Sequence, residues 1–260
     1  MNVLYANAIA IFKKQFAYRI PVIITVIGTI FSVYIQIVLW SYLYESSKKN
    51  MMYMIAYVCV SNFINCFYEP KIAKDIEHRF RTGDLALDLV RPAGISLNFW
   101  GQAIGLAASK ILIRGLPAML FLYFFYRNSM VLIKGENLIF FIIAIGISSI
   151  VYYSIFFTIG FLSFRVSAIW PYVRIVNDII RFISGSVIPL ALFPDIAQRL
   201  FSLMPFRMLY DFPINLLIGN IPNDKIYFNF ILLVFWGIVG IFLIKIACNQ
   251  LSKNLSIQGG

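Results

Sequence analysis

The sequence predicts an all-α integral membrane protein with six spanning helices, and two observations carry that prediction. Hydrophobic residues make up 61% of the 260 residues, and the mean hydropathy is +0.83. A soluble chain of this size could not hide so much apolar surface from water. The apolar residues also gather in runs of about 20, the length that an α-helix needs to cross a bilayer. These runs leave no room for a separate soluble domain, so we expect residues 1–260 to form one membrane domain.

Six apolar runs define the predicted spans, and two further helices accompany them. The spans are Ile20–Tyr44, Met51–Tyr68, Ile111–Ile133, Leu138–Phe161, Trp170–Leu192 and Ile226–Cys248. Residues 1–19 are apolar-periodic with a basic end, which is typical of a helix that lies on the membrane surface. Residues 93–110 predict a helix that rises through the interface, and the small residues Gly101 and Gly105 permit close packing there. The first span is too long for a cleavable signal peptide.

The segment 193–223, between spans 5 and 6, is apolar but interrupted by prolines. These are Pro194, Pro205, Pro213 and Pro222. Each proline removes a backbone donor and breaks a helix, and broken backbone at membrane depth needs shielding by protein or a water-filled cavity. We expect two short helices that dip into the outer leaflet as a re-entrant hairpin. An ordinary extracellular loop with amphipathic helices is the alternative.

The distribution of lysine and arginine predicts the orientation. With the N-terminus in the cytoplasm, the inner segments carry 15 of the 22 basic residues and the outer segments carry 7. Basic residues are enriched in cytoplasmic loops, so we expect both termini inside. This assignment also accounts for the net charge of +11, because the basic residues flank apolar runs. They are not interleaved with aromatic residues on a polar surface, as nucleic-acid binding would require.

The motifs of common enzymes and metal sites are absent from the sequence. It has a single histidine, His78, and contains neither a phosphate-binding P-loop nor a GxSxG nucleophile motif. Cys59, Cys66 and Cys248 lie in or beside apolar runs without metal-ligand spacing, and their odd number argues against a disulfide framework. We therefore expect no catalytic, metal or cofactor site in this chain.

The most strongly charged stretch of the chain, Lys71–Pro92, follows span 2. Its apolar residues recur every four positions and predict a helix with one apolar stripe. The stripe consists of Ile72, Ile76 and Phe80. Gly83 suits a left-handed helix C-cap, and Asp84 is placed to N-cap a second short helix over residues 85–90. We call this stretch the charged island. The pattern fits a compact docking element at the cytoplasmic surface, and it fits a solvated loop equally well.

Polar and charged side chains also occur inside the predicted spans. In span 5, Arg174, Asp178 and Arg181 are about one helical turn apart, and ions at membrane depth are usually paired or functional. Asp178 and Arg181 can pair on one helix face and steady the span near the inner interface. Alternatively, the three residues line the cytoplasmic end of a translocation pathway.

Three amides are placed in the first two spans. They are Gln36, Asn62 and Asn65. Such side chains either line a cavity or donate hydrogen bonds between helices, and the sequence leaves both interpretations open.

The charged island resembles the cytoplasmic loop of ABC-2-type transporter permeases, the small six-span subunits that are encoded separately from their ATPase. The family pattern is a basic residue, then Gly-Asp-Leu, then Leu-x-Arg-Pro. Here those residues are Arg81, Gly83, Asp84, Leu85, Leu89, Arg91 and Pro92. Residues 182–206 and the C-terminal Ser-Ile-Gln-Gly-Gly are also similar to the family. The apolar spans alone would match many families, so the island is the most specific part of the resemblance.

The resemblance implies that the island is a coupling helix, which docks into a groove on a nucleotide-binding subunit. Such a helix in a groove is a common recognition mode. The residues assigned to it are Ile76, Arg79, Phe80, Arg81, Gly83, Asp84, Leu85, Asp88 and Arg91. Ile76, Phe80 and Leu85 are expected to fill the groove. The charged residues are expected to form its rim.

The resemblance also implies the partners and the transport activity. A separate ABC ATPase, present in two copies, would hold the ATP and magnesium. Six spans are too few to enclose a pathway, so a second permease would complete a homodimer or a paralogous heterodimer. The assembly would export a hydrophobic or amphipathic substrate across a bacterial plasma membrane, in contact with membrane lipid. Two alternatives are an ion-driven secondary transporter, which usually shows internal repeats, and a membrane-embedded lipid-modifying enzyme, which needs clustered acidic or histidine side chains.

Overall fold

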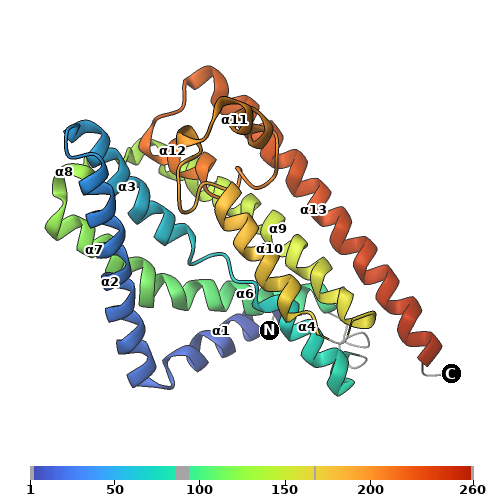
Figure 1. Ribbon diagram of the computed structural model, residues 1–260. Coiled ribbons are helices and arrows are strands. Elements are labelled where there is room, and N and C mark those ends of the chain that lie inside the picture. The colour runs from blue at the N-terminus through green and yellow to red at the C-terminus, as the bar shows by residue number, and fades with distance from the viewer. Residues whose placement is uncertain (1–2, 86–93, 167, 259–260) are drawn as a thin grey trace.

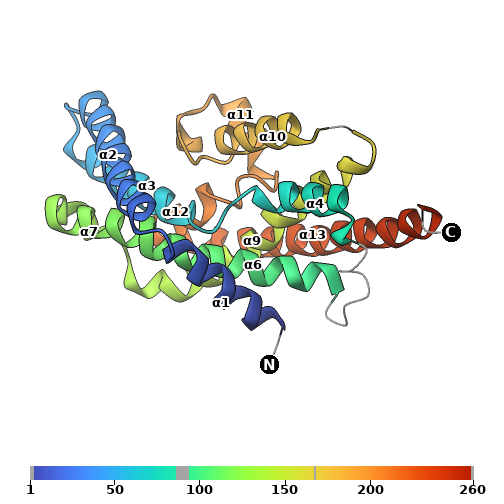
Figure 2. The ribbon, with the colours of Figure 1, turned by 90° about the horizontal axis from the view of Figure 1, so that it is seen from below.

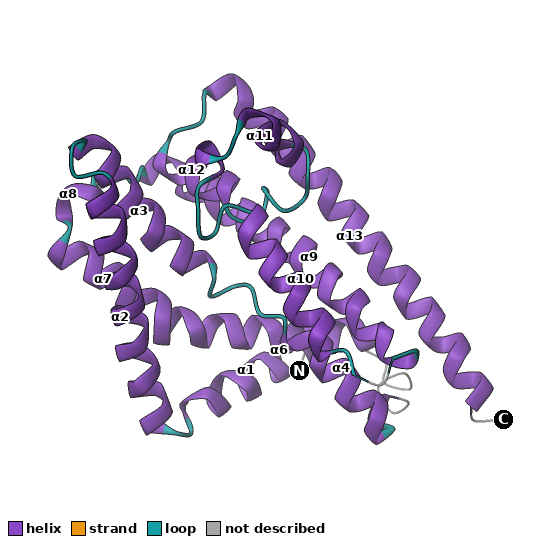
Figure 3. Ribbon diagram, in the orientation of Figure 1, coloured by secondary structure: helices purple, strands orange, loops and turns teal. Residues whose placement is uncertain are grey.

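The computed structural model describes residues 3–85, 94–166 and 168–258, and every regular element in these ranges is helical (Figures 1 and 3). The main helices are α1 (Val3–Phe16), α2 (Arg19–Leu43), α3 (Lys48–Ile64), α4 (Lys71–Thr82), α6 (Gly94–Lys110), α7 (Leu116–Phe125), α8 (Arg127–Met130), α9 (Leu138–Phe161), α10 (Trp170–Ile183), α11 (Asp195–Ser202), α12 (Asp211–Ile218) and α13 (Asn223–Gln258). A π-helical turn, η1 (Ile111–Gly115), joins α6 to α7. Short 3-10 turns are η2 (Gly135–Asn137), η3 (Leu162–Phe164) and η4 (Leu190–Leu192).

Four helical stretches in the described residues are long and apolar enough to cross a membrane. They are Arg19–Leu43, Ser96–Phe125, Gly135–Phe164 and Asn223–Gln250. These stretches correspond to predicted spans 1, 3, 4 and 6 and support an all-α multi-pass membrane protein. The helices at predicted spans 2 and 5 have 17 and 14 residues. At 1.5 Å per residue they extend about 26 Å and 21 Å, less than the bilayer core of about 30 Å.

The predicted limits of span 3 are wrong at the C-terminal end. We expected a span over Ile111–Ile133, whereas the helix ends at Phe125, because Tyr126 leaves the helical conformation with φ −132°. At the other end, α6 runs beside α1 in both views (Figures 1 and 2). The packing is close, as the sequence predicted: a Cβ added at Gly101 would lie 2.7 Å from the carbonyl oxygen of Leu4.

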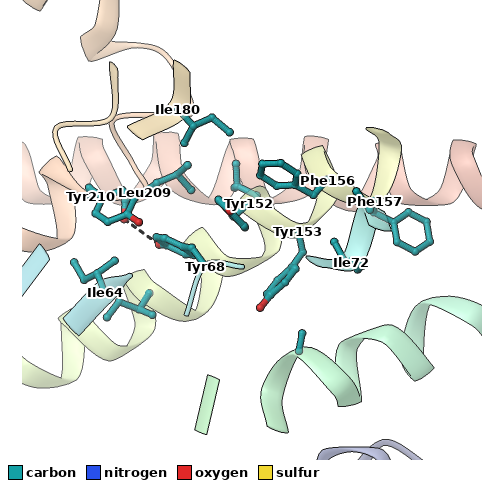
Figure 4. Packing of buried hydrophobic residues seen from close by; sticks show 14 of the residues in the cluster. Ile64, Tyr68, Ile72, Tyr152, Tyr153, Phe156, Phe157, Ile180, Leu209 and Tyr210 are labelled. Atoms are coloured by element: carbon teal, nitrogen blue, oxygen red, sulfur yellow. Dashed lines mark hydrogen bonds between the residues drawn. The ribbon is translucent and has the colours of Figure 1, made fainter. Parts of the chain in front are cut away.

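The centre of the bundle is α9, which packs against α4, α12 and α13. Aromatic side chains fill this core, and several of them belong to α9 (Figure 4). Tyr68 stacks on Tyr152 with ring centroids 4.9 Å apart. The Tyr68 hydroxyl donates a hydrogen bond to the carbonyl oxygen of Leu209 at 2.9 Å. The core therefore joins the segment after α3 to the segment before α12.

The proline-rich segment 193–223 forms two short helices, as predicted, and they have different surroundings. Three apolar residues of the α11 region are mostly exposed, namely Ile196, Leu200 and Leu203. In contrast, Phe212 and Leu216 of α12 are buried against α9 and α13. Protein therefore covers the broken backbone around α12 and leaves the apolar residues of α11 exposed.

Both described ends of the chain lie on the same side of the bundle as α4, and α11 lies on the opposite side (Figure 1).

Predicted spans 2 and 5 end earlier than expected. Helix α3 stops at Ile64 and α10 stops at Ile183. Gly185 follows α10 with φ +86°, and a Cβ there would lie 2.9 Å from the Tyr57 hydroxyl. A left-handed glycine thus ends α10 against α3.

Candidate functional site: a charged helix and a polar cavity

The charged island begins with helix α4, which has the cap that the sequence predicted. Gly83 adopts φ +80°, the left-handed conformation that ends a helix. Two pairs at i,i+4 spacing run along the helix surface. Lys71 lies 3.7 Å from Asp75, and Arg81 donates to Glu77 at 2.9 Å. Residues 86–90 of the second predicted helix, which include Asp88, and Arg91 after it lie outside the described residues.

The apolar face of α4 packs inside this chain and not toward a partner. Ile76 is fully buried, Leu85 is 1% exposed, and a Cβ added at Gly160 of α9 would lie 2.7 Å from the Ile76 Cδ1 atom. Phe80 packs on Phe164 with ring centroids 4.1 Å apart. Our expectation that Ile76 and Leu85 fill a partner's groove is therefore wrong, whereas Phe80 is only partly buried in this chain and its role stays a prediction. A glycine on α9 leaves space for the apolar stripe, so the stripe anchors α4 to the membrane helices.

The opposite face of α4 is exposed and basic. Its residues recur at spacings of 3, 4 and 3 and form one row, which we call the basic stripe. The row consists of Lys71, Lys74, His78 and Arg81. Asp84, also exposed, lies at its end and accepts a hydrogen bond from Thr82 Oγ1 at 2.8 Å. Arg79, predicted to lie on the rim, is instead half-buried, with its guanidinium 5.2 Å from the Phe99 ring centroid.

A cavity of about 670 Å³ lies between α2, α3, η1 and the segment that follows α10. We call it the polar cavity. The residues that α2 contributes to its polar wall are Thr25, Thr29, Ser32 and Gln36. Their spacings of 4, 3 and 4 place them on one face of an α-helix. An otherwise apolar helix therefore presents a polar row to a cavity that is partly open to the surface.

The facing wall belongs to α3 and is tied to two other segments. Asn62 donates to Gln36 Oε1 across a long 3.5 Å contact, and Asn65 Oδ1 accepts from the Tyr210 hydroxyl at 3.1 Å. Ser61 donates to the carbonyl oxygen of Ser186 at 2.7 Å. The sequence left two interpretations open for Asn62 and Asn65, and both apply. The two amides line the cavity and also make contacts between segments.

Of the three charged residues predicted near a pathway in α10, only one lines the cavity. Arg181 does so, together with Arg114 from η1. Arg174 lies away from the cavity, over the Trp170 ring at 5.6 Å from its centroid. Asp178 is exposed and does not form the predicted ion pair with Arg181. The structure therefore brings Asn62, Asn65 and Arg181 together and leaves Arg174 and Asp178 outside.

Sequence reasoning missed two features of this region. The first is the polar row of α2 with Arg114; the regular spacing of hydroxyl and amide residues in the first span was a readable signal. The second is a buried network at α12. Arg207 Nε donates to Asp211 Oδ2 at 3.1 Å, and its Nη1 donates to Asn229 Oδ1 at 3.2 Å. Asn215 donates to Asp211 and accepts from the Tyr53 hydroxyl at 2.6 Å.

Comparison with known proteins decides the family. A family model described as ABC-2 family transporter protein matches residues 23–259. The chain belongs to the ABC-2 transporter family. The match contains α4 and the whole polar cavity, whereas α1 lies outside it. No curated protein and no solved structure matches the chain.

Membership of the ABC-2 family confirms the resemblance that the island carried. It makes the chain the multi-pass membrane subunit of an ABC transporter, a transport subunit and not an enzyme. The described residues also hold no group of three histidine, cysteine, aspartate or glutamate side chains that could bind a metal ion.

Proposed function

We propose that this ABC-2 subunit moves a substrate outward by receiving the movements of a separate ATPase through helix α4. The observation that carries the proposal is the two-sided character of α4. One face is buried on α9 through Ile76, and the other exposes the basic stripe. A helix that transmits motion needs both a firm attachment to the moving part and a free face for its driver.

Two contacts support transmission from α4 to the rest of the bundle. Ile76 packs on Gly160, so a shift of α4 presses directly on α9. Glu77 Oε1 also accepts a hydrogen bond from the backbone nitrogen of Ile169 at 3.4 Å. Ile169 is the residue before α10, and α10 ends close to the polar cavity. Movement of α4 therefore reaches α9 and α10 through neighbouring residues.

The proposed assembly contains two ATPase subunits, which hold ATP and magnesium, and a second permease that is either identical or paralogous. In this arrangement α3 and α10, although each is shorter than the bilayer core, are the second and fifth of six spans. The basic stripe lies in the cytoplasm with both termini. Segment 193–223 closes the outer end of the pathway. The basic residues of the inner segments favour this orientation, and the membrane would be a bacterial plasma membrane.

The test replaces exposed residues of the charged island and measures how accessible the polar cavity is to a thiol reagent. In a chain without native cysteines, a cysteine introduced at Thr29 reports cavity access through its rate of maleimide labelling. In membranes that contain the ATPase, ATP should change that rate. Arg81→Ala and Asp84→Ala should each abolish the ATP response while leaving membrane insertion and labelling without ATP unchanged.

The matched control is Arg199→Ala, which removes an exposed arginine from α11 at the opposite end of the molecule. It should retain the full ATP response. If both island variants respond to ATP as the unmodified chain does, the coupling role of α4 is refuted.

A further inference from the structure

We propose that the polar cavity binds the anionic head group of an amphipathic molecule, with the two arginines as its ligands. The inference rests on the proposed function only in taking that molecule to be the transport substrate. The binding itself follows from three properties of the cavity: its charge, the position of its arginines and the order of its polar and apolar walls.

The charge of the cavity is positive and not balanced by acidic residues. Arg114 and Arg181 line it, and none of its lining residues is an aspartate or glutamate. Neither arginine makes an ion pair with a carboxylate in the described part of the chain. Its remaining polar lining is uncharged, with hydroxyls such as Thr29 and amides such as Asn62. A cation would be repelled here, and an anion would find both guanidinium groups and hydrogen-bond donors.

The position of Arg114 calls for a partner that compensates its charge. Arg114 lies within the candidate span Ser96–Phe125, where an arginine is costly unless a partner or water compensates its charge. Arg181 lies on α10, outside the candidate spans, and both arginine side chains are exposed. Arg114 lies on η1, and π-helical turns are rare and frequently occur at functional sites. Guanidinium groups bind phosphate, sulfate or carboxylate through two parallel hydrogen bonds. These groups are therefore suited to a tetrahedral or planar anion.

The walls of the cavity change from polar to apolar along α2. The polar row ends at Gln36, and Leu39 and Leu43 continue the lining of α2. Val187 and Ile188 add further apolar lining. From Thr25 to Leu43 the helix rises about 27 Å at 1.5 Å per residue. A volume of about 670 Å³ falls in the range of small-molecule sites, about 300–1,000 Å³. The shape and lining suit a charged head with a hydrocarbon tail.

The first experiment uses probes that share one tail and differ in head-group charge. The purified permease in phosphatidylcholine nanodiscs is titrated calorimetrically with decyl phosphate, decyl maltoside and decyltrimethylammonium, and empty nanodiscs supply the background. Decyl phosphate should bind at least tenfold more tightly than the cationic probe, which corresponds to about 1.4 kcal/mol. Equal affinity for both charged probes, or preference for the cationic one, would overturn the proposal.

The second experiment assigns the binding to the arginines. Arg114→Gln and Arg181→Gln should each weaken decyl phosphate binding roughly tenfold and leave decyl maltoside binding unchanged. Arg114→Lys should retain part of the preference for the anion, which a merely structural role would not predict. Arg199→Gln, outside the cavity, should bind like the unmodified chain. Full anion preference in the double Arg114→Gln, Arg181→Gln variant would contradict the assignment.

A third experiment distinguishes two sources of the anion, a membrane lipid and a non-lipid amphiphile. Native mass spectrometry of permease from nanodiscs that contain phosphatidylglycerol should show whether this lipid is retained in an arginine-dependent way. Retention identifies a membrane lipid as the anion, and its absence together with decyl phosphate binding identifies a non-lipid amphiphile. Both results support an anion site.

All of these titrations use permease without ATPase. Anion binding can therefore hold even if the coupling proposal fails. Conversely, loss of anion discrimination in a chain that still responds to ATP would leave the proposed function intact and refute only the substrate class.

Discussion

Replacing Gly160 by alanine tests the contact through which α4 is attached to the bundle. A Cβ there would lie 2.7 Å from Cδ1 of Ile76, 3.0 Å from its Cβ and 3.2 Å from its Cγ2. The Cδ1 and Cγ2 methyl groups can move by side-chain rotation, but the Cβ atom can yield only if α4 moves. Overpacking of this kind costs about 1–3 kcal/mol, whereas alanine in a helix interior gains about 0.5–1 kcal/mol over glycine.

The matched control is Gly146→Ala in the same helix, where an added Cβ would meet nothing within 4 Å. Both variants replace a glycine of α9, although Gly160 lies one residue before the end of the helix and Gly146 lies in its interior. The propensity gain at Gly160 is therefore no larger than at Gly146, and the steric effect accounts for most of their difference. Gly160→Ala should therefore be less stable than Gly146→Ala by about 1–3 kcal/mol. Equilibrium unfolding of the purified permease in detergent measures this difference, and equal stability of the two variants would refute the proposed packing.

A double-mutant cycle shows whether the clash with Ile76 causes the destabilisation expected for Gly160→Ala. Ile76→Ala alone should destabilise by about 2–5 kcal/mol, as expected for a large-to-small change in a core. In the Gly160→Ala background its effect should be smaller by at least about 1 kcal/mol, because neighbouring residues do not act additively. Additive effects would mean that the added methyl group is accommodated elsewhere.

Two further contacts yield predictions of the same kind. Gly105→Ala should detach α1 from α6, because its Cβ would collide with the backbone of Ala8; faster proteolysis within α1 than in Gly146→Ala would show this, and unchanged protection would contradict it. Asp211→Asn should destabilise the fold by about 3–5 kcal/mol, because it leaves the part-buried Arg207 without its ion partner. Unfolding measurements should find that the added substitution Arg207→Gln restores part of this loss, and a further loss would exclude the pair as its cause.

The sequence predicted those features of the fold that depend on local pattern. Apolar run length located α2, α9 and α13, and glycine chemistry located the end of α4 at Gly83. The end of α10 was misplaced, because apolar residues continue past Ile183 although Gly185 turns the chain. Hydropathy reports the surroundings of side chains and does not report such a backbone conformation.

The candidate site was predicted less completely than the fold. The apolar stripe of α4 was correct, but its burial partner was assigned to another protein because periodicity identifies an apolar face and not the surface that covers it. The polar row of α2 was readable from its spacing. In contrast, the presence of Arg114 and Arg181 on one cavity depends on tertiary packing, which leaves the neighbouring Asp178 outside the cavity. No local pattern contains that information.

The most direct test of the central claim is purification of this permease, solubilised in detergent, together with the products of its neighbouring genes. A P-loop ATPase should co-purify with the unmodified chain and should be lost when Lys74→Glu and Arg81→Glu reverse the charge of the basic stripe. The combined variant should still insert and remain folded, because both side chains are exposed. Absence of an ATPase from the purified protein, or its full retention by the charge-reversed variant, would contradict the docking role of α4.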